Sequence, residues 1–228
     1  MITLQEWKSM SIRERTLFLD ENCKINGRGG PRKLVHGIGE NDAPACISQR
    51  ISGKLVACPA YHVWKGVLQR CYDTKCQDRH PSYIGVTVCD EWHKFSKFRL
   101  WWLEHQVDGY QLDKDLLSDG KLYSPETCLF VPQWLNTFII DRRADRGAWP
   151  IGVYFNNRDS RFQAQCSNPF TKKNEFLGYF STPEAAHLAW RTRKLEIAAE
   201  LRPSMDAIDT RIYPRVVEII NNQSKETT

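Results

Sequence analysis

The alternation of side chains over residues 161–167 constrains the fold of this chain more than any other feature of its sequence. Every second residue is small or apolar, namely Phe162, Ala164 and Cys166. The residues between them are polar, namely Arg161, Gln163 and Gln165. Because successive side chains of a β-strand point to opposite faces, the segment predicts a strand with one buried face and one open face.

A helix that begins after Thr182 is expected to cover the buried face. Thr182 is a suitable N-cap, Pro183 stands at the first helical position, and Glu184 places negative charge near the positive end of the helix dipole. The residues predicted to face the sheet are Ala186, Ala189, Trp190, Ile197 and Leu201. Two further strands are predicted at 151–156 and 175–181, so we expect a three-stranded sheet packed on one helix.

The open face of this sheet carries side chains that can recognise nucleic acid. On the first strand, Val153 and Phe155 are expected to point inward, and the outward residues are Tyr154 and Asn156. The turns add positive charge at Arg158, Lys172 and Lys173. Arg and Gln side chains can bond guanine and adenine edges in pairs, and a small sheet can enter the major groove, where turn cations would meet phosphates. The alternative is a polar face that contacts only solvent.

This segment resembles the plant ethylene-response-factor (Apetala-type) DNA-binding domain over about residues 148–202. The motifs that carry the resemblance are GVYF at 152–155, RFQAQC at 161–166, LGYF at 177–180 and PEAAHLAW at 183–190. The resemblance implies a sheet that docks in the major groove of double-stranded DNA through its outward residues. Tyr154 stands where the family commonly has Arg, and Gln165 where it has Glu, so no base preference is transferred.

The central segment 112–136 combines acidic residues with a turn and a terminal amide. Its sequence, LDKDLLSDGKLYSPETCLFVPQWLN, predicts two short strands around Ser118-Asp119-Gly120 and a helix from about Pro132 that carries Asn136. Carboxylate and amide oxygens are the hard ligands that Mg²⁺ prefers. Acidic residues beside Lys also occur on many solvated surfaces, so this spacing alone leaves both interpretations open.

The longer pattern resembles phage HNH-type homing endonucleases of the ββα-metal (His-Me finger) class over about residues 59–140. Its motifs are WKGVLQRCY, GVTVCDEW, LDKD and YSPETC, followed by an Asn. The resemblance implies that Asp113 and Asn136 hold Mg²⁺ or Mn²⁺, with Lys114 at the general-base position and Thr127 at the position of a central Asn. Together with the C-terminal segment, it implies a phage nuclease fused to an Apetala-type DNA reader.

The Lys at the base position leaves the activity open. A protonated Lys cannot take a proton from water unless it is strongly desolvated, whereas it can stabilise charge on a phosphate. Asp115, His93 or His105 would then serve as the base, although a His on an aromatic helix is more often structural. The two main hypotheses are a metal-dependent DNA endonuclease and a catalytically inactive DNA-binding protein, either a regulator or an anti-host factor. An RNA- or protein-binding adaptor is the third.

The cysteines suggest a structural zinc ion as one of two alternatives. The chain has eight Cys and no Cys-x-x-Cys pair. Cys71, Cys89 and Cys128 lie at the ends of predicted elements, and Cys58, Cys76 or His80 is a candidate fourth ligand. The other alternative is that they are small buried hydrophobes.

The expected organisation is an α+β chain with a DNA partner and no small-molecule cofactor. Residues 1–58 are expected to form a helix at 2–22, which Thr3 and Glu6 cap, and a Gly/Pro-rich basic arm. The remaining regions are the HNH-like module 59–140, the linker 141–147, the reader 148–205 and the tail 206–228. The longest apolar runs, such as 138–140, are too short to cross a bilayer, and no secretory signal is evident, so we expect a cytoplasmic phage protein in the bacterial host.

Overall fold

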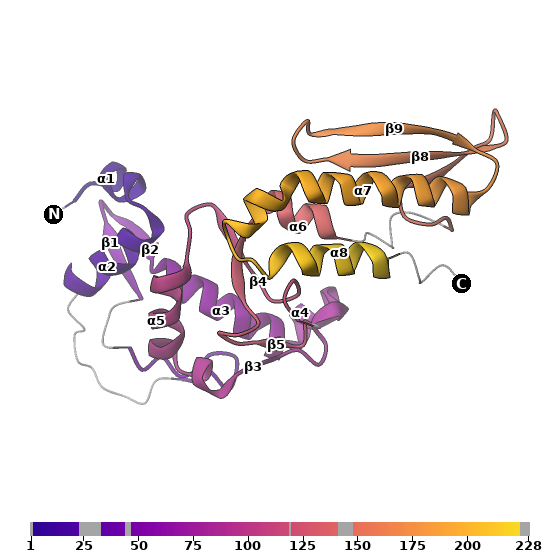
Figure 1. Cartoon of the computed structure of the whole chain (residues 1–228). Helices are drawn as coiled ribbons and strands as arrows, with labels where there is room; N and C mark the ends of the chain where they lie inside the picture. The colour runs from indigo at the N-terminus through magenta and orange to yellow at the C-terminus, as the bar shows by residue number, and fades with distance from the viewer. Residues whose placement is uncertain (1, 23–32, 44–46, 119, 141–147, 224–228) are drawn as a thin grey trace. The chain divides into compact units, whose positions relative to one another are not determined.

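The computed structural model describes residues 2–22, 33–43, 47–118, 120–140 and 148–223. The chain is a mixed α and β protein that divides into two compact units, Met1–Phe130 and Val131–Thr228 (Figure 1). The division falls inside strand β6 (Leu129–Pro132), before the charged segment 141–147 at which the sequence predicts a boundary. That predicted linker lies outside the described residues. Among the described residues, no helix combines the length and apolar character that crossing a bilayer requires.

The first unit begins with two short helices, α1 (Leu4–Ser9) and α2 (Ile12–Asn22), where the sequence predicts one. The predicted capping box is confirmed, because the Glu6 amide donates to Thr3 Oγ1 (3.2 Å) and the Thr3 amide donates to Glu6 Oε2 (2.7 Å). The helix breaks at Met10, whose backbone is extended. Ser11 and Glu14 then repeat the same pair of hydrogen bonds, so a second cap starts α2.

Replacing Thr3 by Ala is expected to lower the free energy of unfolding of the first unit by about 1 kcal/mol, because one side-chain cap is lost. Urea denaturation followed by tryptophan fluorescence measures this, since Trp7 lies buried in α1. The matched control is Lys8→Ala, an exposed substitution in the same helix. Equal stability of the Thr3 and Lys8 variants would contradict the capping role.

The rest of the first unit surrounds an aromatic core. The elements are β1 (Ser48–Ile51), β2 (Lys54–Ala57), α3 (Pro59–Tyr72), α4 (Thr74–Arg79), η1 (Pro81–Tyr83), β3 (Thr87–Val88), η2 (Asp90–His93), α5 (Phe95–His105), β4 (Tyr110–Asp113), β5 (Leu122–Tyr123) and β6. The aromatic stripe predicted for residues 90–105 is confirmed, since Trp92, Phe95, Phe98 and Trp102 are all almost fully buried. Trp64 on α3 fixes this core by donating from Nε1 to the Trp92 carbonyl (2.7 Å).

The strands of the first unit are short and form three two-stranded sheets among the described residues, β1–β2, β3–β5 and β4–β6. The strand predicted at 83–88 is reduced to Thr87–Val88, because Gly85 adopts a φ of +77° and the chain turns before it can pair. The described part of the predicted basic arm, 33–43, does not extend into solvent as a strand. Val35 bridges Gly39, and Ala43 is buried in the core.

The second unit contains the predicted three-stranded antiparallel sheet. Its elements are α6 (Gln133–Ile139), β7 (Val153–Asn156), β8 (Arg161–Asn168), β9 (Lys173–Phe180), α7 (Pro183–Asp206) and α8 (Ile212–Asn222). The strands lie in the order β7–β8–β9, and α7 packs on one face of them (Figure 1). Thr182 caps α7 as predicted, accepting a hydrogen bond from the Ala185 amide. Val153, Ala164 and Ala186 form the buried contact between sheet and helix.

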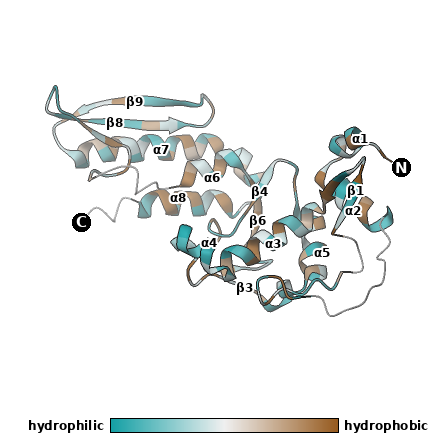
Figure 2. Ribbon diagram, turned by 180° about the vertical axis from the view of Figure 1, so that it is seen from behind, coloured by the Kyte–Doolittle hydropathy of each residue, from teal (hydrophilic) through white to brown (hydrophobic). Residues whose placement is uncertain are grey.

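The C-terminal part of the chain is more ordered than the predicted tail at 206–228. Helix α7 continues through Pro203 to Asp206, because Leu201 and Met205 are both buried and hold its last turns against the unit. Helix α8 then buries Ile212, Val216 and Ile220, which are spaced by one helical turn (Figure 2). The prediction of a tail is therefore wrong for residues 212–222.

Candidate nucleic-acid interface

The face of the sheet that points away from α7 is the site predicted from the sequence. The strand register places Tyr154, Gln163 and Tyr179 in one row across the three strands. Gln165 lies opposite Phe176 in the next row. We call this surface the open face; its residues are Tyr154, Asn156, Arg161, Gln163, Gln165, Ser167, Asn174, Phe176 and Tyr179.

A β-bulge gives the open face an aromatic residue that the sequence analysis missed. The register shifts between Ala164 and Gln165, and Gly178 on the partner strand has a φ of +127°. Because of this extra residue, Phe176 and Tyr179 lie on the same face although they are three positions apart. Phe176 is 56% exposed, and its ring centroid is 5.2 Å from that of Tyr179. The signal in the sequence was Gly178, since a Gly within a strand often marks a bulge.

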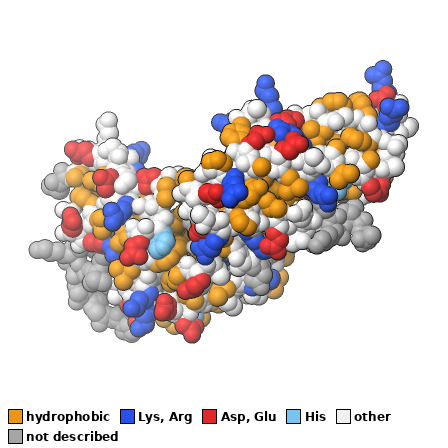
Figure 3. Space-filling model, viewed as in Figure 1, with side chains coloured by type: hydrophobic (Ala, Val, Ile, Leu, Met, Phe, Trp, Pro, Cys, Tyr) orange, Lys and Arg blue, Asp and Glu red, His pale blue; other side chains and the backbone are white. Residues whose placement is uncertain are grey.

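The charges around the open face favour the binding of a polyanion. Arg161, the turn residues Arg158 and Lys172, and Lys173, which the sequence places in a turn and the structure at the start of β9, are all exposed. Lys and Arg side chains stand at both ends of the sheet (Figure 3). The strand positions of the open face, all of which the structure describes, include no Asp or Glu. A surface with cations at its ends and amides between them can follow a phosphate backbone and contact base edges.

The acidic residues near the sheet are held in other interactions. Glu175 faces α7, where Arg193 donates from Nε to its carboxylate (2.6 Å). Asp159 lies in the β7–β8 turn and accepts from the Asn156 amide (2.9 Å). Asn156 Oδ1 also accepts a hydrogen bond from the Arg158 backbone amide. The side chain predicted to contact DNA is therefore partly engaged within its own turn. Phe155 lies on the same side of the sheet as α7, as predicted. It is still 39% exposed, and it packs against Trp149, which is itself partly exposed.

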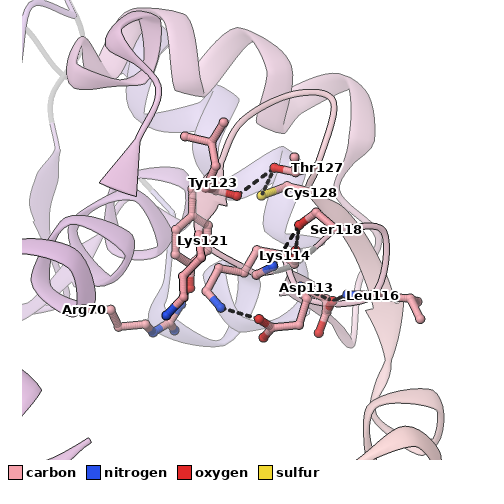
Figure 4. Close-up of polar contacts among 12 residues, drawn as sticks. Arg70, Asp113, Lys114, Leu116, Ser118, Lys121, Tyr123, Thr127 and Cys128 are labelled. Atoms are coloured by element: carbon pink, nitrogen blue, oxygen red, sulfur yellow. Dashed lines mark hydrogen bonds and ion pairs between the residues drawn. The ribbon is translucent and has the colours of Figure 1, made fainter. Parts of the chain in front are cut away.

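The two strands predicted around residues 118–120 do not pair with each other; β4 pairs with β6, and β5 pairs with β3. We call residues 110–132, from β4 to β6, the central hairpin, and its acidic residues shape a turn. Asp113 Oδ1 accepts hydrogen bonds from the amides of Asp115 (2.9 Å) and Leu116 (2.7 Å) (Figure 4). Burial raises the pKa of the Asp113 carboxyl, against the opposite effect of the Leu116 hydrogen bond. A carboxylate whose pKa is raised and whose Oδ1 binds two amides is a poorer ligand for a hard cation than one held open to solvent.

Lys114 is buried, and its ammonium contacts neighbouring side chains. Its side chain forms an ion pair with Asp115. Its ammonium also lies 5.5 Å from the centroid of the Tyr83 ring and 5.6 Å from that of Tyr123. Gly120 completes this arrangement, because a Cβ there would collide with the Asp115 carboxylate. The geometry therefore gives Lys114 the role of a cation that joins the hairpin to the aromatic core.

The other predicted catalytic residues also make local contacts. Thr127 accepts from the Ser124 amide and donates from Oγ1 to the Leu122 carbonyl (2.8 Å), which closes the turn before β6. Asn136 lies on α6 and belongs to the second compact unit, whereas Asp113 belongs to the first. His93 faces the Tyr72 hydroxyl (3.4 Å), and His105 stacks on Trp101, which agrees with the structural alternative for both.

The thiols proposed as zinc ligands lie in apolar surroundings. Cys71 and Cys128 are buried, and burial raises the pKa of each to about 12. Cys89 is partly exposed, and burial also raises the pKa of its thiol. Zinc binds thiolate, so these environments oppose ligation. Within the described part of the chain, no three or more His, Cys, Asp and Glu side chains gather as a metal site would require. The zinc and Mg²⁺ sites remain predictions.

Comparison of the chain with protein-family models, with curated proteins and with solved structures gives no match. A functional conclusion therefore has to come from the residues and geometry described above.

Proposed function

We propose that this chain is a double-stranded DNA-binding protein that inserts the open face of β7–β9 into the major groove. The observation that carries the proposal is the composition of that face: Arg161, Gln163 and Gln165 on the central strand, with no acidic residue among its strand positions. These side chains can pair with base edges, while the exposed cations of the turns contact phosphates. The same docking mode is implied by the resemblance to the Apetala-type domain.

Of the two main hypotheses, we favour the catalytically inactive DNA-binding protein over the metal-dependent endonuclease. Asp113, Lys114 and Thr127 all make contacts that stabilise the hairpin. With these groups engaged, the central hairpin acts as a scaffold, and DNA recognition does not depend on a metal.

Three exposed aromatic residues support a second candidate, a single-stranded nucleic-acid binder. Tyr154, Phe176 and Tyr179 on an open sheet could stack on unpaired bases. The Phe176 and Tyr179 rings meet at 64°, so they pack edge to face and present no continuous flat platform. This geometry, together with the amide side chains between the aromatic residues, favours double-stranded DNA over a single strand as the ligand.

Fluorescence anisotropy with a labelled random duplex, and with one strand of it alone, tests the proposal. We expect tighter binding to the duplex and a steep loss of affinity with salt. Selection from a random duplex library then provides the preferred site. Stronger binding to the single strand, DNA or RNA, would replace the duplex proposal by the second candidate.

Nicking of a supercoiled plasmid in Mg²⁺ or Mn²⁺ tests the endonuclease hypothesis. We expect no cleavage that depends on Asp113, because the carboxylate of this residue is engaged in the turn of the hairpin. The wild-type protein is compared with Asp113→Ala, with duplex binding measured on the same samples to verify that both proteins are folded. Nicked product that forms with the wild type and is absent with Asp113→Ala would establish the endonuclease instead.

A further inference from the structure

The first unit contains a basic pocket that is separate from the open face of the sheet. Its volume is about 540 Å³, and α3, α4 and η1 form its walls. The lining residues are His62, Lys65, Gly66, Gln69, Arg70, Cys76, Arg79, His80 and Tyr83. The five from α3 recur at helical spacing, so one face of that helix forms one side of the pocket. None of the nine lining residues, all of which the structure describes, is acidic.

Arg70 is the cation for which the pocket offers no counter-charge. Its Nη1 donates to the Tyr123 hydroxyl (3.3 Å), and both residues are labelled in Figure 4. Its guanidinium lies 5.9 Å from the centroid of the Tyr83 ring. Among the described residues it has no ion pair with a carboxylate. Desolvation disfavours the charge of Arg70, but the Tyr123 hydroxyl and Tyr83 outweigh it and raise the pKa of the guanidinium, so the group stays charged and can attract an anion from outside.

Two other residues that line the pocket add to its positive charge. Lys114 lies over the same Tyr83 ring, but its ion pair with Asp115 means that it adds no net charge. Lys65 and Arg79 are exposed at the walls of the pocket. An Arg held by aromatic rings presents several N–H donors in a fixed plane, which matches the oxygens of a phosphate.

We infer that this basic pocket binds phosphate groups of a nucleic-acid backbone. Its volume exceeds that of one phosphate, so it can hold adjacent phosphates of a strand. The pocket would then be a second contact with the DNA that the open face binds. The inference that the phosphates belong to a nucleic-acid backbone rests on the proposed function, whereas the phosphate site itself does not. Arg70 binds the phosphate oxygens, and Lys65 and Arg79 each contact a neighbouring phosphate at the walls of the pocket.

Gly66 allows a sharp test of the phosphate site. A Cβ at this position would meet no atom within 4 Å, so a side chain can begin here without displacing its neighbours. Gly66→Glu adds a carboxylate to the pocket, and Gly66→Gln adds the same volume without charge. Isothermal titration with inorganic triphosphate is expected to show binding by the wild type and by Gly66→Gln, and affinity at least about tenfold lower for Gly66→Glu. No binding by the wild type, or an equal loss in both variants, would overturn the phosphate site.

A salt series with labelled duplex tests the assignment to a backbone. Lys65→Ala with Arg79→Ala is expected to reduce the slope of log K against log salt by about 2, since about one counterion is released per phosphate contact. The matched control is Arg13→Ala with Lys54→Ala, which removes the same charge from exposed positions outside the pocket. Triphosphate binding with an unchanged slope would overturn the backbone assignment in favour of a free phosphate compound. Failure of the wild type to bind duplex at all, with triphosphate binding intact, would reject the proposed function and the backbone while leaving the phosphate site.

Discussion

Replacing Arg161, Gln163 and Gln165 together by Ala is expected to lower the affinity for the preferred duplex by at least about 100-fold. Each good pair of hydrogen bonds between such a side chain and a base edge contributes about 1–3 kcal/mol of discrimination. All three side chains lie on the open face, which points away from α7, so the sheet should keep its fold. Anisotropy titration with the selected duplex measures the loss, and circular dichroism verifies the fold.

The control for this variant is Arg202→Ala, which removes one positive charge from an exposed position on α7. We expect its affinity to stay within about threefold of the wild type, because a distant charge acts only through screened electrostatics. The three single variants of the open face should each change the preferred base at one position, whereas Lys172→Ala should weaken all sequences equally. Equal losses in the triple variant and in Arg202→Ala would contradict the role of the open face.

Replacing Lys194 by Met is expected to stabilise the second unit at pH 7 by up to about 3 kcal/mol. Lys194 is 7% exposed, and its ammonium lies 3.7 Å from the centroid of the Phe138 ring. It has no carboxylate partner among the described residues, and burial lowers its pKa to about 8. Met has a similar length and no charge, so it can fill the same space in the core.

The effect of Lys194 should depend on pH in a defined direction. Below pH 8 the side chain is protonated in both states, so the folded protein bears the full cost of the buried charge. Between pH 8 and the usual Lys pKa of about 10.4, the unfolded state binds more protons than the folded state, and stability rises with pH. The difference in unfolding free energy between Lys194→Met and the wild type should therefore be largest at pH 7 and close to zero near the upper end of that range.

Denaturation of both proteins across this pH range measures the difference, and other groups that titrate there cancel. Cys166 is an exception, because burial raises the pKa of its thiol to about 11 and Lys194 acts in the opposite direction, so both proteins are compared in a Cys166→Ala background. Lys172→Met is the matched control, since Lys172 is exposed in a turn and its loss should change stability little at any pH. A Lys194→Met protein that is less stable than the wild type at pH 7 would show that the contact with Phe138 stabilises more than burial costs.

Local patterns predicted the second unit well because its structure depends mainly on local rules. The alternation over 161–167 and the cap at Thr182 each act within a few residues, and both are confirmed. The bulge at Gly178 was missed because it depends on pairing between two strands. Helix α8 was missed although Ile212, Val216 and Ile220 carry a helical period, since the polar residues after them favoured a tail.

The central hairpin shows the limit of predicting roles from motif positions. The spacing of Asp113 and Lys114 is visible in the sequence, but the contacts of Lys114 with Tyr83 and Tyr123 come from segments about 30 and 9 residues away along the chain. Burial of a charged residue between aromatic rings is a tertiary property that no local pattern encodes. The same is true of Arg70, whose importance appears only when α3, η1 and β5 are brought together.

The position of the boundary within β6 has a practical consequence for dividing the protein. A fragment that starts at residue 148 would contain the sheet and both C-terminal helices but would lack α6. Phe138 would then no longer cover Lys194, and Gln223 would lose the Ile139 carbonyl to which it donates (3.0 Å). Such a fragment should be aggregation-prone and open to proteases, whereas one that begins at Val131 keeps the whole compact unit and is the better choice for binding assays.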